Sequence, residues 1–517
     1  MSNQTSDNNK RIAKNTLLLY FRMLFMMLVS LYTSRVILRT LGVVDFGIYN
    51  VVGGVIAMLG FITGSLGAAS SRYITYDLGV GDMSIMKKTF GNILTIHYIL
   101  AGFILLLGET IGLWFMETQL TIPEGRETAA FWVYQFSILS SIMAVITVPY
   151  NATIIAHEKM SAFAYISIVD VILKLLIVYL LIIIPFDKLI IYSFLFFCIQ
   201  VFDQFIYITY CNNKFEEVHT TLVYDKKVFR EIFAFAGWTM NGNLACVGYT
   251  QGLNILLNMF FGPAVNAARG IAVQVQNTCK QFCVNFQMSI NPQLTKQYAV
   301  GNLEEMDRLL IKSSKFSFFI LLLITLPLIF EAPLVLNIWL GEVPAHTVSF
   351  LRLILISSLL NTLANPLVAS IQATGKIKKF QIVEGSLLIT IVPISYLLLK
   401  FAGVPPEMVF VVHICVEIIT QSVRLKLVLP QINLPITVYL RKVIYPIFLV
   451  AALAPIFPYM IYMNLRIGGL EALIVIIISI VCCACSIFFV GCSKNERIFI
   501  IEKSNQIFLK LKRKTNG

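Results

Sequence analysis

Several ionisable side chains lie inside long apolar stretches of this sequence, where a charged group is costly. Arg22 lies well inside one such stretch, and Arg269 and Lys280 lie in another. A charge at the depth of a bilayer costs roughly 3 kcal/mol on insertion scales, so it usually faces a protein interior or a water-filled cavity. Arginine binds phosphate oxygens bidentately through its planar guanidinium group. These residues predict a positively charged cavity wall.

The stretch around Lys280 carries two polar stripes at helical spacing. Arg269, Gln276, Lys280 and Gln287 are separated by 7, 4 and 7 residues, which places them on one face of a helix. A second stripe runs beside it, formed by Gln274, Asn277, Gln281 and Asn285. The candidate binding residues are Arg22, Arg72, Arg269, Gln276, Asn277 and Lys280. In the alternative, the amides join neighbouring helices and the arginines near helix ends extend to the lipid headgroups.

Acidic residues in the apolar stretches are candidates for carrying a coupling proton. Asp170 and Lys174 are spaced i,i+4 on one helix face, so the alternative for them is a structural ion pair. Glu384 and Glu417 lie in two later stretches, and His413 is one turn before Glu417. Burial favours the neutral form of a carboxyl group, which suits it to exchanging a proton. Asp170, Lys174, Glu384 and Glu417 are therefore the coupling candidates.

Fourteen long apolar stretches position these residues. A bilayer core needs roughly 20 apolar residues for each helical span. Of the 517 residues, 58% are hydrophobic and only 13% are charged, against about 25% charged in a soluble domain. The predicted spans cover residues 14–36, 46–71, 90–115, 128–150, 161–184, 188–211, 232–260, 264–292, 316–338, 348–373, 380–401, 405–428, 443–463 and 469–492.

The net charge of +13 is distributed by topology. With the N-terminus inside, the inner segments and the span ends next to them hold 29 of the 40 lysines and arginines, and the outer segments with their adjoining span ends hold eight. This is the positive-inside pattern, and it predicts that both ends of the chain are cytoplasmic. The positive charge therefore reflects the topology of the chain and its attraction to anionic lipid headgroups. It does not indicate nucleic acid as a partner.

The first twelve spans read as a duplication. A shift of 220 residues places Gly42 on Gly262 and Gly81 on Gly301, and a shift of 217 places Pro149 on Pro366. Because six is an even number of spans, the two halves have the same orientation, as parallel repeats do. We expect an all-α, polytopic membrane protein with two pseudo-symmetric six-helix lobes. Its predicted parts are lobes over 1–212 and 213–430, helices 13 and 14 over 431–493, and a basic amphipathic cytoplasmic tail over 494–517.

The sequence carries no recognisable catalytic, metal-binding or nucleotide-binding motif. The ten cysteines lack the spacing of a disulfide framework or a zinc site. There is no Walker motif for nucleotide hydrolysis. The longest predicted outer loops, near 116–127 and 339–347, are short and hold few candidate catalytic groups. We therefore expect no cofactor, no metal and no enzymatic activity.

The N-terminal region resembles a known transporter family. The resemblance rests on Asn15-Thr-Leu-Leu-Leu-Tyr-Phe-Arg-Met-Leu, on Ser30-Leu-Tyr-Thr-Ser-Arg35-Val, on Leu41-Gly-Val-Val-Asp-Phe-Gly-Ile-Tyr-Asn50 and on Ala69-Ser-Ser-Arg72-Tyr. These segments are similar to the polysaccharide-transport proteins, the O-antigen flippase group of the multidrug, oligosaccharidyl-lipid and polysaccharide exporter superfamily. The likeness is strongest over residues 15–90, and the last two helices match the fourteen-helix members.

The resemblance implies a flippase that moves undecaprenyl-diphosphate-linked oligosaccharide across the bacterial cytoplasmic membrane by alternating access. It implies a cationic cavity between two lobes, for which Arg22, Arg269 and Lys280 are the candidates by helix position. Membrane lipids and other polysaccharide-assembly membrane proteins are the further expected partners. The alternatives are a drug or cation antiporter or a peptidoglycan-precursor flippase of the same superfamily, and a membrane-embedded polysaccharide polymerase.

Overall fold

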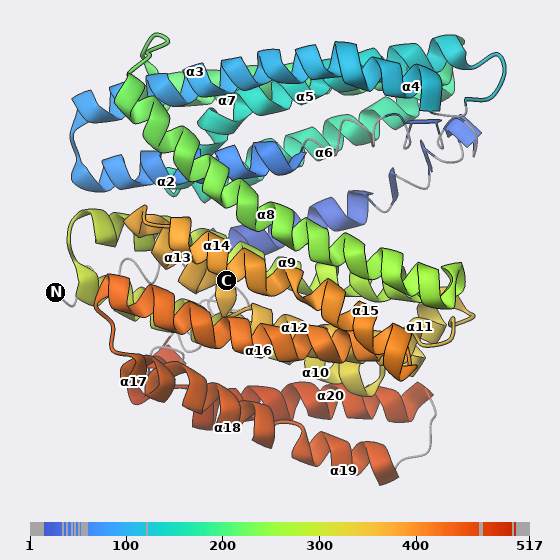
Figure 1. Ribbon diagram of the computed structural model, residues 1–517, viewed down its shortest axis with the longest axis vertical. Helices are drawn as coiled ribbons and strands as arrows, with labels where there is room; N and C mark the ends of the chain where they lie inside the picture. Colours follow the sequence, from blue (N-terminus) through green and yellow to red (C-terminus); the bar gives the residue numbers. More distant parts are fainter. Residues whose placement is uncertain are drawn as a thin grey trace, which may run out of the picture. The chain divides into compact units, whose positions relative to one another are not determined.

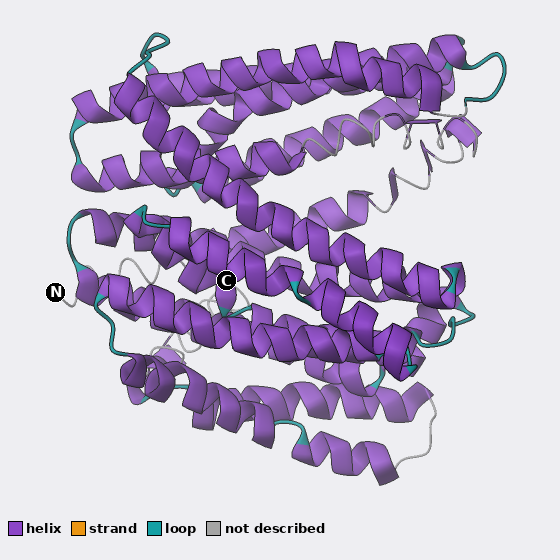
Figure 2. Ribbon diagram, viewed as in Figure 1, coloured by secondary structure: helices purple, strands orange, loops and turns teal. Residues whose placement is uncertain are grey.

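The chain is helical throughout the part that the structure describes. The computed structural model describes residues 15–30, 32–33, 36–37, 40–42, 45, 48–49, 52, 60–119, 122–464, 469–498 and 501–502. These residues form helices joined by loops and contain no β-strand (Figures 1 and 2). The prediction of an all-α protein is confirmed.

Eleven helical segments of the described chain are long and apolar enough to cross a membrane: Met83–Thr118, Glu127–Ala156, Met160–Ile183, Lys188–Lys214, Lys226–Phe261, Leu303–Phe330, Thr347–Thr374, Lys378–Ala402, Met408–Ile432, Ile436–Asn464 and Glu471–Gly491. The helix Asn15–Ser30, α2 (Gly60–Val80) and α9 (Pro263–Ala299) overlap the three remaining predicted spans. The polar stripes of α9 keep it out of the apolar set, although it is helical over its whole length. The chain is a multi-pass membrane protein.

Contacts group the chain into two compact units. Unit 1 comprises Met1–Cys246, Met288–Met306 and Ala369–Gly385, and unit 2 comprises Val247–Gln287, Asp307–Val368 and Ser386–Gly517. Helices α8 (Lys226–Phe261) and α9 each contribute one end to each unit. The four segments predicted from the sequence remain predictions, and most of the predicted tail lies outside the described residues.

Unit 1 is built around α5, which packs along α3 and α7 (Figure 1). Besides the helix Asn15–Ser30 and α2, its helices are α3 (Met83–Leu107), α4 (Leu113–Gln119), α5 (Glu127–Ala156), α6 (Met160–Ile183) and α7 (Lys188–Lys214), with a π-helical turn at Gly108–Gly112 and a 3-10 turn at Glu216–Val218. Aspartates begin two of these helices. Asp82 accepts hydrogen bonds from the amides of residues 84 and 85, and Asp187 does the same for residues 189 and 190.

Unit 2 contains most of the later helices. The later helices are α10 (Leu303–Phe330), α11 (Ala332–Leu340), α12 (Thr347–Asn361), α13 (Ala364–Thr374), α14 (Lys378–Ile389), α15 (Ile391–Ala402), α16 (Met408–Val428), α17 (Ile436–Tyr439), α18 (Tyr445–Leu453), α19 (Ile456–Asn464) and α20 (Gly469–Ser486), with 3-10 or π turns at Leu429–Ile432, Leu440–Ile444 and Ile487–Gly491. Of these, the larger part of α13 and of α14 belongs to unit 1, through Ala369–Gly385. The last helices are attached to α10, because Tyr439 bonds to Ser314 and Lys315 pairs with Glu496 at 2.6 Å. Burial alone would raise the pKa of Glu496, but its bonds to Lys315 outweigh burial and lower that pKa.

The connection between α7 and α8 is held against unit 1 by charged contacts. His157 Nε2 lies 2.5 Å from Glu217, and Lys88 lies 2.6 Å from Asp225. Burial opposes ionisation of Glu217, yet the bond to His157 outweighs burial and lowers the pKa of Glu217. The hydrogen bond from Lys88 lowers the pKa of Asp225 to about 2. Both acids are therefore ionised at neutral pH and fix the connection to the first six helices.

The backbone carries the predicted duplication at its turns. Left-handed residues recur at matching positions: Gly42 and Gly262 both have φ +81°, Gly81 and Gly301 have +83° and +74°, and Glu158 and Gly375 have +57° and +75°. The first two pairs are separated by 220 residues and the third by 217. A left-handed φ is rare outside glycine. Its recurrence at the spacing of the repeat therefore supports two copies of one six-helix plan.

Candidate functional site

Arg22 lies on the helix Asn15–Ser30, in unit 1, and is held by an aromatic ring. Its guanidinium carbon is 4.2 Å from the centre of the Phe163 ring, a cation–π distance. The buried Nε has no hydrogen-bond partner among the described residues. Asp170 and Tyr207 act on Arg22 electrostatically. Arg22 thus keeps part of its hydrogen-bonding capacity unused.

Beside Arg22 lies a pair of carboxyl groups, which we call the acid pair: Asp170 on α6 and Asp203 on α7. Asp170 acts on Asp203 electrostatically, and two carboxyl groups that lie close together can hold one proton between them. The predicted ion pair is also present, with Lys174 Nζ 2.8 Å from Asp170. The acid pair therefore has the composition of a site that binds and releases one proton.

Unit 2 contains a group of charged residues around His413, which we call the basic cluster. Arg269, Lys280 and Arg424 act electrostatically on His413, and so does Glu417. Three cationic side chains therefore accompany one carboxylate. The predicted candidates Arg269, Lys280 and Glu417 belong to this cluster, and positive charge exceeds negative charge within it.

The partners of Arg269 in the basic cluster are neutral. Arg269 is 7% exposed and donates to the amide oxygen of Asn254 and, at 3.1 Å, to the carbonyl of Thr250. Neither partner cancels the charge of the guanidinium group. Lys280 is half-buried on the same helix and contributes its charge to the cluster.

Glu417 has an arginine as its partner. Arg424 Nη1 lies 2.6 Å from Glu417, and the two side chains are 3% and 1% exposed. Asn361 also reaches Glu417, at 3.4 Å. A buried carboxylate that is paired in this way is held in its charged form. The contact makes Glu417 a weaker coupling candidate than the acid pair. Glu384, the remaining candidate, is half-buried on α14.

The two stripes of α9 have different surroundings. Gln276 donates to Ser358 at 2.7 Å, and Gln287 donates to Ser317 at 3.0 Å, so the first stripe is bonded into unit 2. In the second stripe, Gln274, Asn277 and Gln281 are exposed. Exposed amides within a predicted membrane span are poorly suited to lipid. We therefore infer that this face of α9 is in contact with water or with a polar ligand.

Arg72 differs from the other candidate cations. Its Nε and Nη2 donate to the carbonyl oxygens of Gln372 and Ala373, each at 3.2 Å. These carbonyls belong to the last turn of α13, where the helix dipole favours a cation. The contacts favour a structural role for Arg72 over the predicted role in ligand binding.

Sequence reasoning did not find two of these pairings. Arg424 is seven residues from Glu417, a spacing of two helical turns that could have indicated the pair. Asp203 and Asp170 lie on different helices, and no sequence signal joins them. Among the residues that the structure describes, no group of three histidine, cysteine or acidic residues could hold a metal ion.

Solved structures show which fold this is, whereas no protein-family model and no curated protein matches the sequence. An outward-facing multidrug resistance MATE family transporter of the MOP superfamily aligns with a TM-score of 0.70 at 15% identity, over 82% of this chain and 96% of that one. A MATE protein in its bent conformation gives 0.70 at 15% identity, over 83% and 96%. A MOP superfamily transporter from Pyrococcus furiosus, whose binding pocket of reverse polarity suggests a different function, gives 0.66 at 15%, over 82% and 96%. The chain has the two-lobe fold of the MATE transporters.

Proposed function

We propose that this protein is a membrane transporter that works by alternating access, and that its cargo is an undecaprenyl-diphosphate-linked oligosaccharide. The proposed reaction is movement of the lipid-linked glycan from the inner to the outer leaflet of the bacterial cytoplasmic membrane. The MATE-like fold supports the transporter class. The basic cluster carries the choice of cargo.

The argument for an anionic cargo is the excess of positive charge at membrane depth. Among the described residues that act on His413, the three cations Arg269, Lys280 and Arg424 and the carboxylate Glu417 form a net positive cluster. The bonds of Arg269 to neutral groups leave its charge available to a ligand. A diphosphate carries oxygens that suit a guanidinium fork and an ammonium group. We infer that the diphosphate of the cargo binds next to Arg269 and Lys280, with Arg22 as the candidate in unit 1.

The amides of α9 supply a second part of the proposal. Gln274, Asn277 and Gln281 are exposed, and each amide can both donate and accept hydrogen bonds. Sugar hydroxyl groups need partners of that kind. A glycan moving past α9 would exchange bonds with water for bonds with these amides, at little net cost.

The alternative cargoes fit the basic cluster unequally. A cationic drug would be repelled by the cluster, so the antiporter alternative is disfavoured. A peptidoglycan precursor carries the same diphosphate, so it remains as the alternative that the experiment below must separate. A polymerase would need catalytic groups in outer loops, and the predicted outer loops are short.

We further propose that a proton drives the cycle and binds at the acid pair. Asp170 and Asp203 act on each other electrostatically, and with both carboxyl groups ionised two negative charges would lie close together. Lys174 and Arg22 would then attract both carboxylates. Gain and loss of one proton would thus change the contacts between α6, α7 and the first helix.

The test is complementation of a deletion strain with Arg269→Ala and Lys280→Ala. The expected result is a fall of surface glycan by tenfold or more, with accumulation of the lipid-linked intermediate at normal protein levels. Arg230→Ala is the matched control, because Arg230 is an exposed arginine at the start of α8. Full glycan display by both variants would contradict the proposal. Cell lysis on deletion, with intact surface glycan, would indicate the peptidoglycan precursor instead.

A further inference from the structure

Unit 1 contains a buried acid in a turn that binds a helix of the second predicted half. Glu158 lies between α5 and α6, has φ +57° and is 5% exposed. Its carboxylate accepts hydrogen bonds from Gln293 at 3.0 Å and from Lys296 at 3.1 Å, both near the end of α9. A non-glycine residue in this conformation is strained. The contacts to α9 offset that strain.

A reciprocal contact joins α2 to the turn after α13. Arg72 donates hydrogen bonds to the carbonyl oxygens of residues 372 and 373. Gly375 also lies close to Arg72, because a Cβ placed on this glycine would be 2.9 Å from Nη2 of Arg72. The rings of Tyr73 and Tyr76 lie 4.4 and 4.8 Å from the guanidinium carbon. Arg72 is thus fixed from three directions against a turn of the second predicted half.

The two contacts are related by the duplication. The shift of 217 carries Glu158 onto Gly375, and the shift of 220 carries Tyr76 onto Lys296. In each contact a helix of one predicted half binds the equivalent turn of the other half: α9 binds the turn at Glu158, and α2 binds the turn before Gly375. Gly79 and Ala299 are also equivalent positions, and they touch each other, because a Cβ on Gly79 would lie 2.6 Å from that of Ala299. This pair therefore lies where a pseudo-two-fold axis would pass.

We infer that these contacts form an inner latch, a polar catch that closes the predicted cytoplasmic end of the transporter and must open once in each cycle. The inference rests on the proposed alternating access. By the positive-inside pattern, the turns at 156–159 and 373–376 and the end of α9 all lie on the cytoplasmic side. The latch consists mainly of hydrogen bonds and one ion pair, which water can replace when the two sides part.

The test reads the opening of the latch by cysteine labelling. Ser289 is fully buried and bonds to Thr16 at 2.9 Å, so Ser289→Cys in a variant without the native cysteines reports separation of α9 from the first helix. In inverted membrane vesicles, a membrane-impermeant maleimide should label this cysteine slowly. Glu158→Lys should raise the labelling rate about tenfold, because it places a second cation against Lys296.

The matched variants decide the interpretation. The exchange Glu158→Lys with Lys296→Glu should return labelling to its slow rate, since the ion pair is restored in reverse. Lys159→Glu, a reversal at the exposed neighbouring residue, should leave the rate unchanged. Unchanged labelling in Glu158→Lys, no recovery in the exchange variant, or labelling only from the outer side of the membrane would each overturn the latch.

A second measurement tests the latch even if the Glu158→Lys variant fails to fold. Cysteines introduced by Gly79→Cys and Ala299→Cys should form a disulfide. The two Cβ atoms would start 2.6 Å apart, so α2 and α9 need to move apart only slightly to reach the separation of about 3.8 Å that disulfides have. The disulfide should stop transport, and a reductant should restore it. Absence of cross-linking would overturn the latch. Both readouts of latch geometry, labelling and cross-linking, need no cargo, so an error in the proposed cargo would leave them unaffected.

Discussion

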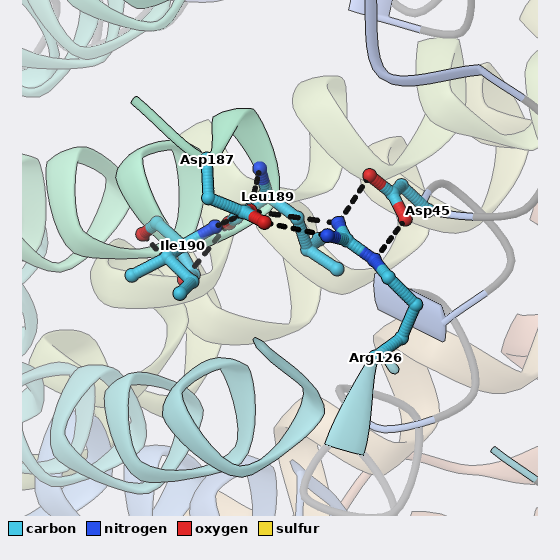
Figure 3. A network of polar contacts seen from close by, with 6 residues as sticks. Asp45, Arg126, Asp187, Leu189 and Ile190 are labelled. Atoms are coloured by element: carbon cyan, nitrogen blue, oxygen red, sulfur yellow. Dashed lines mark hydrogen bonds and ion pairs between the residues drawn. The ribbon is translucent and has the colours of Figure 1, made fainter. Parts of the chain in front are cut away.

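Replacing Arg126 by alanine should loosen the end of unit 1 that the sequence places on the outer side of the membrane. Figure 3 shows the Arg126 guanidinium group between two carboxylates, Asp45 and Asp187. Its Nε donates to Asp45 at 2.9 Å and its Nη1 donates to Asp187 at 2.5 Å, while Nη2 contacts both acids. Asp45 belongs to the Leu41-Gly-Val-Val-Asp-Phe-Gly segment of the family resemblance. The contact gives this aspartate a structural role, because Arg126 joins it to Asp187 at the start of α7.

The size of the effect follows from partial burial. The side chains of Arg126, Asp45 and Asp187 are 26%, 19% and 33% exposed. Exposed ion pairs contribute about 0–1 kcal/mol, and breaking buried pairs costs about 3–5 kcal/mol. We expect Arg126→Ala to cost about 2 kcal/mol, since it leaves two facing carboxylates without a cation. A loss of that size lowers the melting temperature by about 4 °C or more in a domain of 150–250 residues, and by somewhat less in this larger unit.

The assay is thermal unfolding in detergent, followed by a thiol-reactive dye. Buried native cysteines such as Cys211, Cys279 and Cys283 become reactive only on unfolding. Arg126→Lys should recover about half of the loss, because it keeps the charge but not the fork. If Arg126→Ala melted at the wild-type temperature, or if the lysine variant were no better than alanine, the reasoning would be refuted.

The stability that Arg126 gives through its contacts with Asp45 and Asp187 depends on pH in a defined way. Burial alone would raise the pKa of Asp187, but the bonds from Arg126 and from two backbone amides outweigh burial and lower that pKa below its ordinary value of 3.8. A carboxyl group with a lowered pKa in the folded state stabilises the fold above its unfolded pKa, and this contribution is lost as pH falls through the folded value. The difference in melting temperature between wild type and Arg126→Ala should therefore be constant from about pH 5 to 8.

Three further predictions concern the buried charges. Arg424→Met should destabilise the protein by about 3–5 kcal/mol in thermal unfolding, because Glu417 is left buried and unpaired, and adding Glu417→Gln should recover most of the loss; a fully stable single variant would contradict this. Asp203→Asn should remove proton uptake by reconstituted protein while protein levels stay normal, and unchanged uptake would exclude the acid pair as the coupling site. Arg72→Ala should speed labelling of a cysteine at Ser289, whereas an unaltered rate would separate Arg72 from the inner latch.

Contacts within one helix could be read from the sequence. The spacing of Asp170 and Lys174 predicted their ion pair, which the structure confirms at 2.8 Å. The hydropathy of the chain predicted where the helices lie, and the shifts of 217 and 220 residues predicted the matching turns. In each case the periodicity of the backbone alone determines which residues share a face.

Helix ends and contacts between helices could not be read in this way. Helix α10 begins at Leu303, well before residue 316, because a helix can continue past the membrane boundary once polar residues such as Glu304 and Glu305 suit its first turn. The pairing of Asp170 with Asp203 depends on how α6 and α7 are rotated and how deep each lies. Hydropathy fixes neither quantity.

Three arginines that the sequence grouped as one kind of site have three different environments. Arg72 lies against the carbonyl end of a helix, whose partial negative charge already complements it. Arg22 has an aromatic face and the acid pair beside it, so the charge around it would change if the acid pair bound the proposed proton. Arg269 has an amide and one carbonyl, which orient the guanidinium group without neutralising it. An anionic cargo would therefore gain most electrostatic energy at Arg269, whereas Arg72 belongs to the proposed inner latch and Arg22 lies beside the proposed proton site.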